Sequence, residues 1–511
     1  MSSDSDDALT RVASGGGIVL LGVVLELGIS FLAKLLIARV LGPVNYGVVS
    51  LGVTTMVVVS TLVLLGLHTG VGRYLPRFEG TADRRGVVVS AFQTAVPLAV
   101  AAGGLVYVFA PVIATAGFSD PAVTPVLRVF GLVIPLAAVM KLAIGTSRGL
   151  QQVFPKVSIR NIVLPVVRFT AVIVVLWLGF DALGVAWAYA IAYTGAMGVG
   201  LYFLWRDTDL FAWGSPATPV RRELLAFSAP LVISTAMTFV FSDIDTFMLG
   251  YFSSTGDVGI YNTVYPLAHL LAVPMSSFGF IVMPVVSKLH ERGEHGTVRQ
   301  LYQTTSKWIF LASFPVFAVI VLFPTHAISL TFGPAYADGS LALVVLAGAF
   351  FTHAIAGPNF DLLTSIGRTR LIMYDDTFVA LLNVGLNLLL IPRYSFLGAA
   401  IATTIAYVLM NVLYSLQLYF ETGIQPLTPA LLRTALLGTT TIAVLYGIVQ
   451  TLFTVTVSVF LGTVVVFGLV YLIVVVRVAI EPQEVELLLD FEERFDLNLG
   501  VFKQLVSRLR S

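Results

Sequence analysis

Five basic side chains lie inside long apolar stretches of the chain, where a positive charge needs a specific purpose. They are Lys34, Arg128, Lys141, Arg160 and Arg168, and each stands among Val, Leu, Ile, Ala and Phe. An ionised group in hydrocarbon is costly, so it normally faces a water-filled cavity or another charge. Guanidinium forks match phosphate oxygens, and an ammonium binds the same group as a point charge. Lys34, Lys141, Arg160 and Arg168 could therefore line a cavity for an anionic group such as a phosphate. For Arg128, Lys141 and Arg160, which stand toward helix ends, the alternative is that they snorkel to the interface.

Three embedded acids could compensate these cations or couple an ion to a conformational change. Glu26 lies in the middle of the first apolar segment, and we expect it to pair with Arg168; a proton- or cation-coupling role is the alternative. Asp243 and Asp245 lie in the outer half of the seventh segment, on opposite faces of a helix, so at most one faces a cavity. We expect Asp245 to lie near Lys34 as a gate pair; the alternative is that both aspartates are hydrated at the membrane interface.

Four polar side chains follow one another in the eighth apolar segment. Tyr261, Asn262, Tyr265 and His269 stand close to Pro274, and a proline in a spanning helix permits a bend. Their hydroxyl, amide and imidazole groups could bond sugar hydroxyls. The alternative for His269 is a packed polar residue without a transport role.

Several kinds of catalytic and metal site are missing from the chain. It holds no cysteine, which excludes disulfides, a thiolate zinc site and a thiol nucleophile. The glycines at 15–17 run directly into Ile18 without the lysine of a nucleotide-binding loop. The six histidines are scattered, and no Ser/His/Asp set has a recognisable spacing. We therefore expect no enzyme activity, no cofactor and no resident metal.

The composition defines the elements that must position these residues. Of the 511 residues, 57% are hydrophobic and 11% are charged, whereas a soluble domain is about 25% charged. This excludes a water-soluble globular enzyme and predicts an all-α polytopic membrane protein, because lipid requires internally satisfied backbones and the apolar runs do not alternate. The net charge of +1 gives no general attraction to nucleic acid, so no such partner is expected.

About 20 apolar residues are needed for each spanning helix. The sequence predicts fourteen such segments, near residues 16–38, 48–70, 86–110, 122–145, 157–179, 182–204, 225–250, 259–286, 306–331, 341–364, 371–391, 396–419, 430–452 and 455–477.

The loops between these segments differ in charge. Those after even-numbered segments hold most of the Lys and Arg, whereas those after odd-numbered segments hold only Arg39 and Arg393. Basic loops stay on the cytoplasmic side, so both termini are predicted to be cytoplasmic.

The chain also repeats itself. GVAWAYAIAY at 184–193 aligns without gaps on GAAIATTIAY at 398–407, and NYG at 45–47 resembles DVG at 257–259 at nearly the same offset. Two units of six spans in the same orientation are a transporter arrangement. We expect an N-terminal lobe at 1–213, a second lobe at 214–422, an added helix pair at 423–479 and, at 480–511, a cytoplasmic amphipathic tail.

Several runs resemble a known family. AKLLIARVLGPVNYG at 33–47 is similar to the first-loop signature of Wzx-like polysaccharide flippases, as are GRYLPR at 72–77 and DTFMLG at 245–250 followed by VGIYN at 258–262. These proteins form part of the multidrug/oligosaccharidyl-lipid/polysaccharide (MOP) exporter superfamily.

The resemblance implies a V-shaped pair of lobes that opens alternately to each side of the plasma membrane. It implies translocation of a polyprenyl-(pyro)phosphate-linked oligosaccharide to the outer leaflet for cell-surface polysaccharide or glycoprotein glycan assembly. The expected partners are this substrate, membrane lipid and glycosyltransferases or a polymerase of the same pathway, and we expect a monomer. A cation-coupled multidrug (MATE-like) antiporter and a peptidoglycan-precursor flippase remain alternatives, while a membrane-embedded glycosyltransferase would need a large outer loop or clustered carboxylates that the chain lacks.

Overall fold

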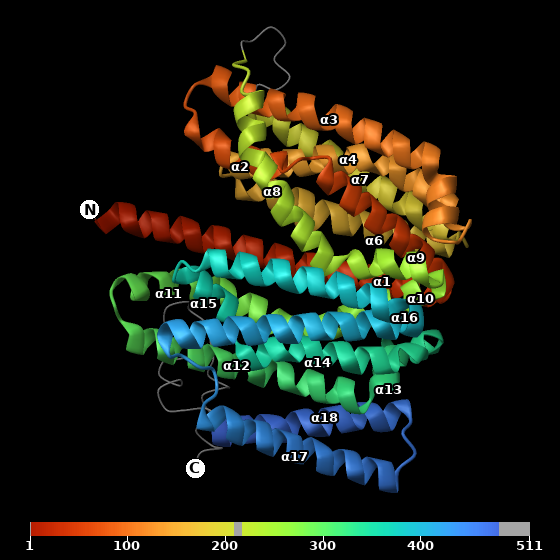
Figure 1. Cartoon of the computed structure of the whole chain (residues 1–511), viewed down its shortest axis with the longest axis vertical. Helices are drawn as coiled ribbons and strands as arrows, with labels where there is room; N and C mark the ends of the chain where they lie inside the picture. Colours follow the sequence, from red (N-terminus) through yellow and green to blue (C-terminus); the bar gives the residue numbers. More distant parts are fainter. Residues whose placement is uncertain (1, 209–216, 480–511) are drawn as a thin grey trace. The chain divides into compact units, whose positions relative to one another are not determined.

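The computed structural model describes residues 2–208 and 217–479, and nearly all of them are helical (Figure 1). Within these residues, nine helices are long and apolar enough to cross a membrane, or ten if one bent pair is counted as a span. This confirms the predicted all-helical membrane class. The nine include α16, Thr369–Thr422, which covers two predicted segments, and the total of fourteen spans stays a prediction.

The helices divide into two compact units. Unit 1 comprises Met1–Thr263 and Asn387–Phe396, and unit 2 comprises Val264–Leu386 and Leu397–Ser511. The predicted lobe boundaries and the V-shaped arrangement stay predictions, and the predicted amphipathic tail at 480–511 lies outside the described residues.

Unit 1 is built around α4. Its helices are α1 Ser2–Leu62, α2 Leu67–Tyr74, α3 Thr81–Val112, α4 Val123–Gly149, α5 Val153–Val157, α6 Leu164–Trp177, α7 Ala182–Asp207, α8 Arg221–Ser242 and α9 Ile244–Phe252. In its most apolar stretch α4 is 67% buried, more than any other candidate span, because it packs against α1, α2, α3 and α7 (Figure 1). This buried helix fixes the neighbours that carry the charged side chains.

Two of three helix breaks near the predicted site residues fall at Gly or Pro, whose backbone chemistry favours a break. In α1 the helix kinks at Gly42, which has φ 72° and precedes Pro43. The predicted seventh segment breaks at Asp243, between α8 and α9. The eighth breaks at the 3-10 turn Leu270–Ala272, directly before Pro274, whose missing N–H cannot complete a helical bond.

The two repeats meet through a reciprocal glycine contact. A Cβ added to Gly47 would lie 1.7 Å from the carbonyl oxygen of Thr255, and a Cβ added to Gly259 would lie 2.0 Å from that of Pro43. Each position is the other shifted by 212 residues, so the NYG and DVG motifs form the same contact twice. Only glycine permits this backbone approach. The contact supports the internal repeat predicted from these motifs.

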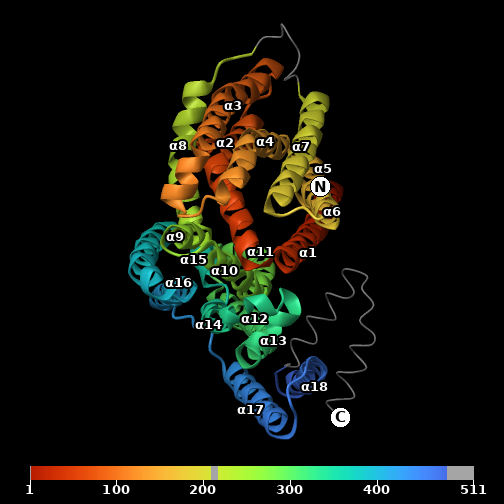
Figure 2. The same cartoon turned by 90° about the vertical axis from the view of Figure 1, so that its right-hand side faces the viewer.

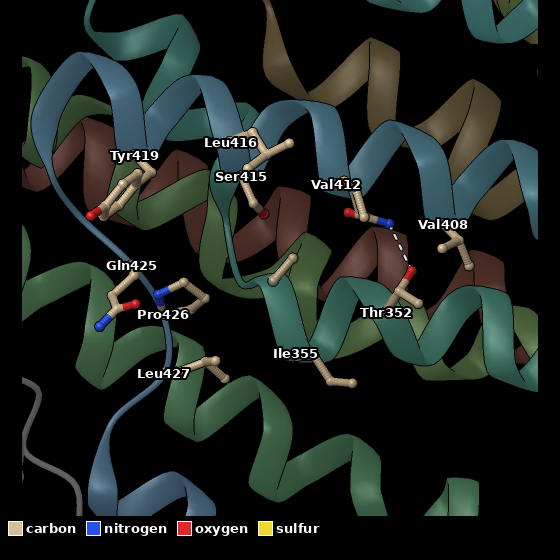
Figure 3. Close-up of a pocket in the computed structure, with 12 residues that line it drawn as sticks. Thr352, Ile355, Val408, Val412, Ser415, Leu416, Tyr419, Gln425, Pro426 and Leu427 are labelled. Carbon is tan, nitrogen blue, oxygen red and sulfur yellow. Dashed lines mark hydrogen bonds between the residues drawn. The ribbon is translucent and has the colours of Figure 1, made fainter.

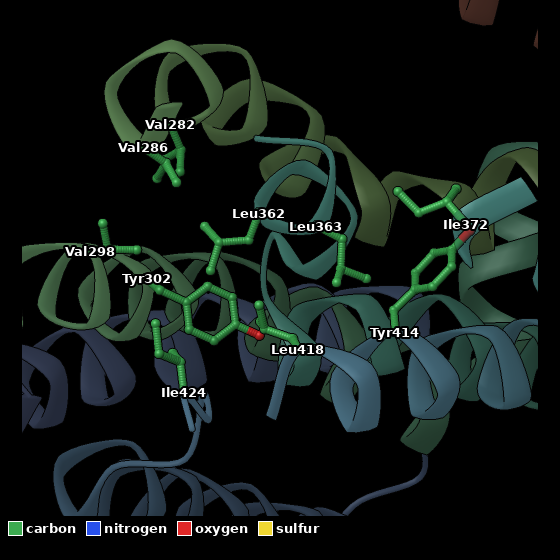
Figure 4. Close-up of a cluster of buried hydrophobic side chains, with 10 residues drawn as sticks. All are labelled: Val282, Val286, Val298, Tyr302, Leu362, Leu363, Ile372, Tyr414, Leu418 and Ile424. Carbon is green, nitrogen blue, oxygen red and sulfur yellow. The ribbon is translucent and has the colours of Figure 1, made fainter. Parts of the chain in front are cut away.

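Unit 2 contains the remaining helices. They are α10 Thr255–His269, whose last turns belong to this unit, α11 Val273–Glu291, α12 His295–Leu322, α13 Pro324–Thr331, α14 Ser340–Ala356, α15 Asn359–Ser365, α16, α17 Pro429–Leu452 and α18 Val457–Val474. The added pair α17 and α18 lies side by side and packs against α12 (Figures 1 and 2). Figure 4 shows the core between α11, α12, α15 and α16, where Tyr302 is fully buried and donates a hydrogen bond of 2.5 Å to the carbonyl of Ala356.

Candidate functional site

Helix α1 and the α5–α6 segment of unit 1 run side by side in the same direction. At one end, a Cβ added to Gly22 would lie 2.8 Å from Val157. Two turns further along α1, Ser30 accepts a hydrogen bond of 2.6 Å from Nη2 of Arg168. This parallel register places the polar side chains of α1 against the basic side chains of the neighbouring segment.

Arg168 lies in α6 and has no carboxylate partner among the described residues. Its guanidinium bonds Ser30 and lies 5.3 Å from the ring centre of Tyr189 in α7, a distance suited to a cation–π contact. Its Nε is buried and has no hydrogen-bond partner within the described part of the chain. An unneutralised guanidinium with an unused donor is suited to binding an anion.

Glu26 pairs with Arg160, so the prediction that it pairs with Arg168 is wrong. Its Oε1 lies 3.6 Å from Nε of Arg160, and its other oxygen accepts a hydrogen bond from Asn161. The register between the two helices explains the difference, because Glu26 is level with Arg160 and Asn161, while Arg168 reaches Ser30 one turn further on. Glu26 therefore compensates charge, but for a different arginine.

Lys141 projects from α4 and is held by hydroxyl groups. Its Nζ donates to Thr61 Oγ1 at 2.6 Å and to Ser60 Oγ at 2.9 Å, near the end of α1. Among the described residues, no carboxylate forms an ion pair with Lys141, Arg168 or Lys34. The ammonium is thus held by neutral groups rather than by a carboxylate.

Lys34 lies close enough to Arg168 and to Asp243 for the charges to interact. The acid near Lys34 is thus Asp243 rather than the expected Asp245. The helix break at Asp243 explains this, because the continuous helix assumed from the sequence does not exist there. Asp245 is instead buried and accepts hydrogen bonds from Tyr261 and from Asn387, the latter at 2.7 Å.

The four predicted sugar contacts separate into two groups. Tyr261 is 3% exposed and donates to Asp245, while the amide of Asn262 bonds Thr246 and the carbonyl of Val258. The Tyr261 phenol and the Asn262 amide are therefore already hydrogen-bonded to other residues of unit 1. Tyr265 and His269 lie in unit 2, where their rings stack at 6.1 Å with an interplanar angle of 16°.

Two basic residues assigned to a cytoplasmic loop belong to the cationic group. The charges of Arg148 and Lys156 act on each other and on Arg160. Spacing could have revealed them, because Arg148 follows Lys141 by two helical turns and Lys156 precedes Arg160 by one. We call Lys34, Lys141, Arg148, Lys156, Arg160 and Arg168 the cationic group of unit 1.

Unit 2 also contains a basic residue that the sequence analysis counts with the cytoplasmic loops. Lys307 lies inside α12 and is 4% exposed. Helix α12 begins at His295, about three turns before the predicted apolar segment, and Lys307 is therefore buried within a helix.

A separate pocket of about 470 Å³ lies within unit 2. Figure 3 shows Val408, Val412 and Leu416 of α16 on one wall, Thr352 and Ile355 of α14 on another, and the linker at 425–427 closing the end. None of the predicted site residues lines this pocket. Among the described residues, no group of three His, Asp or Glu could hold a metal ion.

Comparison with known proteins agrees with the helices and motifs. A family model described as polysaccharide biosynthesis protein matches residues 12–290, more than half of the chain, and the MatE model matches residues 230–389. The probable low-salt glycan biosynthesis flippase Agl15 of Haloferax volcanii is 24% identical over 216 residues. This match covers 40% of the chain and 45% of the relative, so less than half of either protein is compared.

Two solved structures share the fold. The inward closed conformation of the lipid II flippase MurJ has a TM-score of 0.72 at 14% identity, covering 90% of this chain and 98% of that one. An inward-facing multidrug resistance MATE family transporter of the MOP superfamily has a TM-score of 0.66 at 17% identity, with coverages of 78% and 94%. At these identities the likeness concerns the fold alone. The family match extends it: the chain is a multi-pass membrane protein that belongs to the polysaccharide biosynthesis protein family.

Proposed function

We propose that the protein translocates a polyprenyl-(pyro)phosphate-linked oligosaccharide from the cytoplasmic to the outer leaflet of the plasma membrane. Translocation proceeds by alternating access, without catalysis, and both termini are cytoplasmic. The observation that carries the proposal is that Lys141 and Arg168 stand inside membrane helices and are held by hydroxyls and an aromatic ring rather than by carboxylates.

The physical argument is one of charge compensation. A lipid phosphate is permanently negative and cannot enter hydrocarbon at an acceptable cost, and an isolated buried cation is costly for the same reason. The cost of burying the phosphate and that of burying the cation both fall when the two groups meet in a cavity, because charge-assisted hydrogen bonds are stronger than those between neutral groups. The cationic group continues from Lys156 and Arg160 on the cytoplasmic side to Arg168 and Lys34 further along the spans, which suits a phosphate that must move in that direction.

A multidrug antiporter is the second candidate, because the MatE model matches residues 230–389. A carrier of cationic drugs needs accessible embedded acids. In the described residues Glu26 is paired with Arg160, Asp245 is hydrogen-bonded to Tyr261, and Asp243 lies near Lys34. The electrostatics of unit 1 therefore favour an anionic substrate.

The proposal is tested by deleting the gene and analysing lipid extracts by mass spectrometry. We expect a lipid-linked oligosaccharide to accumulate, and in inverted and right-side-out vesicles it should be accessible from the cytoplasmic face only. Accumulation of the same lipid on the outer face would contradict the proposal, as would an unchanged lipid profile together with increased sensitivity to cationic drugs.

A further inference from the structure

Five rings from three helices converge in unit 2, away from the cationic group. Phe350 of α14 lies 5.5 Å from Tyr265, 5.1 Å from His269 and 5.0 Å from Tyr407 of α16, and His353 lies 5.4 Å from Tyr407, all between ring centres. We call these five residues the ring cluster. Phe350, His353 and Tyr407 belong neither to the cationic group nor to the four predicted sugar contacts.

The ring cluster has a buried centre and an accessible, polar edge. Phe350 is 0% exposed, whereas His269 is exposed and Tyr265, His353 and Tyr407 are half-buried. The accessible rings thus carry two phenol groups and two imidazoles. Polar groups in the middle of spanning helices avoid lipid and face a protein interior or a water-filled cavity. Such a combination of apolar ring faces and polar edges is typical of a small-molecule site.

One polar atom of the cluster lacks a well-placed partner. The Nδ1 atom of His353 is buried and has no hydrogen bond of good geometry among the described residues, although the side chain of Asn411 lies close enough to interact with the imidazole. Leaving a buried nitrogen unsatisfied costs about 1–3 kcal/mol in general. A hydroxyl group of a bound ligand would supply the missing bond.

The internal repeat gives an independent reason to place Tyr407 at a binding surface. Tyr407 corresponds to Tyr193 at an offset of 214 residues. In unit 1, Tyr193 lies on α7 one turn from Tyr189 and close enough to Arg168 for the guanidinium charge to act on its phenol. The same repeat position thus adjoins the candidate phosphate-binding arginine in one unit and the ring cluster in the other.

We propose that the ring cluster binds a pyranose ring of the transported head group. The aromatic faces contact the apolar C–H face of the sugar, while the phenols and imidazoles bond its hydroxyls. This inference rests on the proposed function and deepens it, because it names the residues of unit 2 that contact the sugar of the transported lipid.

The test compares two lipids that differ only in the sugar. Equilibrium binding of a short-chain polyprenyl diphosphate carrying a trisaccharide, and of the same lipid without sugar, is measured on the purified full chain in detergent. Tyr407→Leu should weaken binding of the sugar-bearing lipid about tenfold, the size expected for one lost ring contact, and leave the bare lipid unchanged. Tyr407→Phe keeps the ring and should weaken it about threefold.

Phe317→Leu is the matched control, because it removes an aromatic ring that stacks at 4.0 Å on Phe351 in the same unit. It should change neither affinity, and thermal melting confirms that each variant is folded. Equal weakening of both lipids by Tyr407→Leu, or no effect of either Tyr407 variant, would overturn the inference. A wild-type protein that binds the bare lipid but gains nothing from the sugar contradicts this inference alone, whereas one that binds neither contradicts the proposed function.

Discussion

Glu26 forms its ion pair with Arg160, with Oε1 and Nε 3.6 Å apart, and thereby leaves Arg168 without a carboxylate among the described residues. The side chains of the pair are 26% and 52% exposed, so the pair adds little to stability. Its effect is electrostatic, because the charge of Glu26 acts on Lys156 as well as on Arg160.

Replacing Glu26 should therefore alter substrate affinity more than folding. In Glu26→Gln the cationic group loses its compensating charge, and we expect a lipid diphosphate to bind several-fold more tightly and to be released more slowly. The free energy of unfolding should change by no more than about 1 kcal/mol. Binding and melting measurements check both expectations, with Arg160→Gln as the opposite charge change. Weaker binding in Glu26→Gln would show that the acid itself supports the site.

The hydroxyls that hold Lys141 are expected to stabilise the protein only while the ammonium is present. Removing them in Ser60→Ala/Thr61→Ala leaves a buried charge without two of its partners and should cost about 1–3 kcal/mol. In a Lys141→Met background the same double change should cost much less. A double-mutant cycle of melting measurements compares the cost of the double change with and without Lys141. Equal costs in the two backgrounds would contradict the described contacts.

The reciprocal contact of Gly47 and Gly259 predicts a reversible block of transport. A Cβ added to Gly256 would lie 3.6 Å from Cγ2 of Val44, so Val44→Cys/Gly256→Cys places two sulfurs within disulfide reach. The natural chain has no cysteine that could interfere. Oxidation should crosslink the pair and stop translocation, and a reductant should restore it, because the proposed alternating access requires the two motifs to separate at this contact.

Two controls define that prediction. Each single-cysteine variant should be insensitive to oxidation, and Gly47→Ala should abolish crosslinking because its Cβ cannot share space with the Thr255 carbonyl. Full transport by the crosslinked protein would mean that the contact persists throughout the cycle.

The sequence was sufficient for the class of fold and for most of the charged residues, for reasons visible in particular segments. Continuous apolar runs such as 122–145 require a helix in lipid, and α4 occupies Val123–Gly149. Lys141 and Arg168 were identified because a charge in such a run is conspicuous. The NYG and DVG motifs pointed to a repeat because a glycine at both positions permits one backbone contact.

The partners of the charged residues could not be predicted, because they depend on contacts between helices. Spacing along α1 does not reveal whether Glu26 is level with Arg160 or Arg168, since the register against α6 decides it. The break at Asp243 changes which aspartate lies near Lys34, and no local signal at Asp243 predicts it. The ring cluster is equally inaccessible, because α10, α14 and α16 bring together rings that are far apart in sequence.

Arg168 gives the most direct test of the claim that an anionic head group crosses the membrane along a cationic lining. Translocation of a polyprenyl-diphosphate-linked sugar is measured in vesicles by the accessibility of the sugar to an impermeant glycosidase. The variants are Arg168→Ala, Arg168→Lys and the control Arg128→Ala. The control removes a charge from α4, where the Arg128 guanidinium lies 5.9 Å from the centre of the Tyr107 ring. We expect at least a tenfold loss in Arg168→Ala, partial activity in Arg168→Lys and little change in the control. Full activity of Arg168→Ala at normal expression would contradict the account.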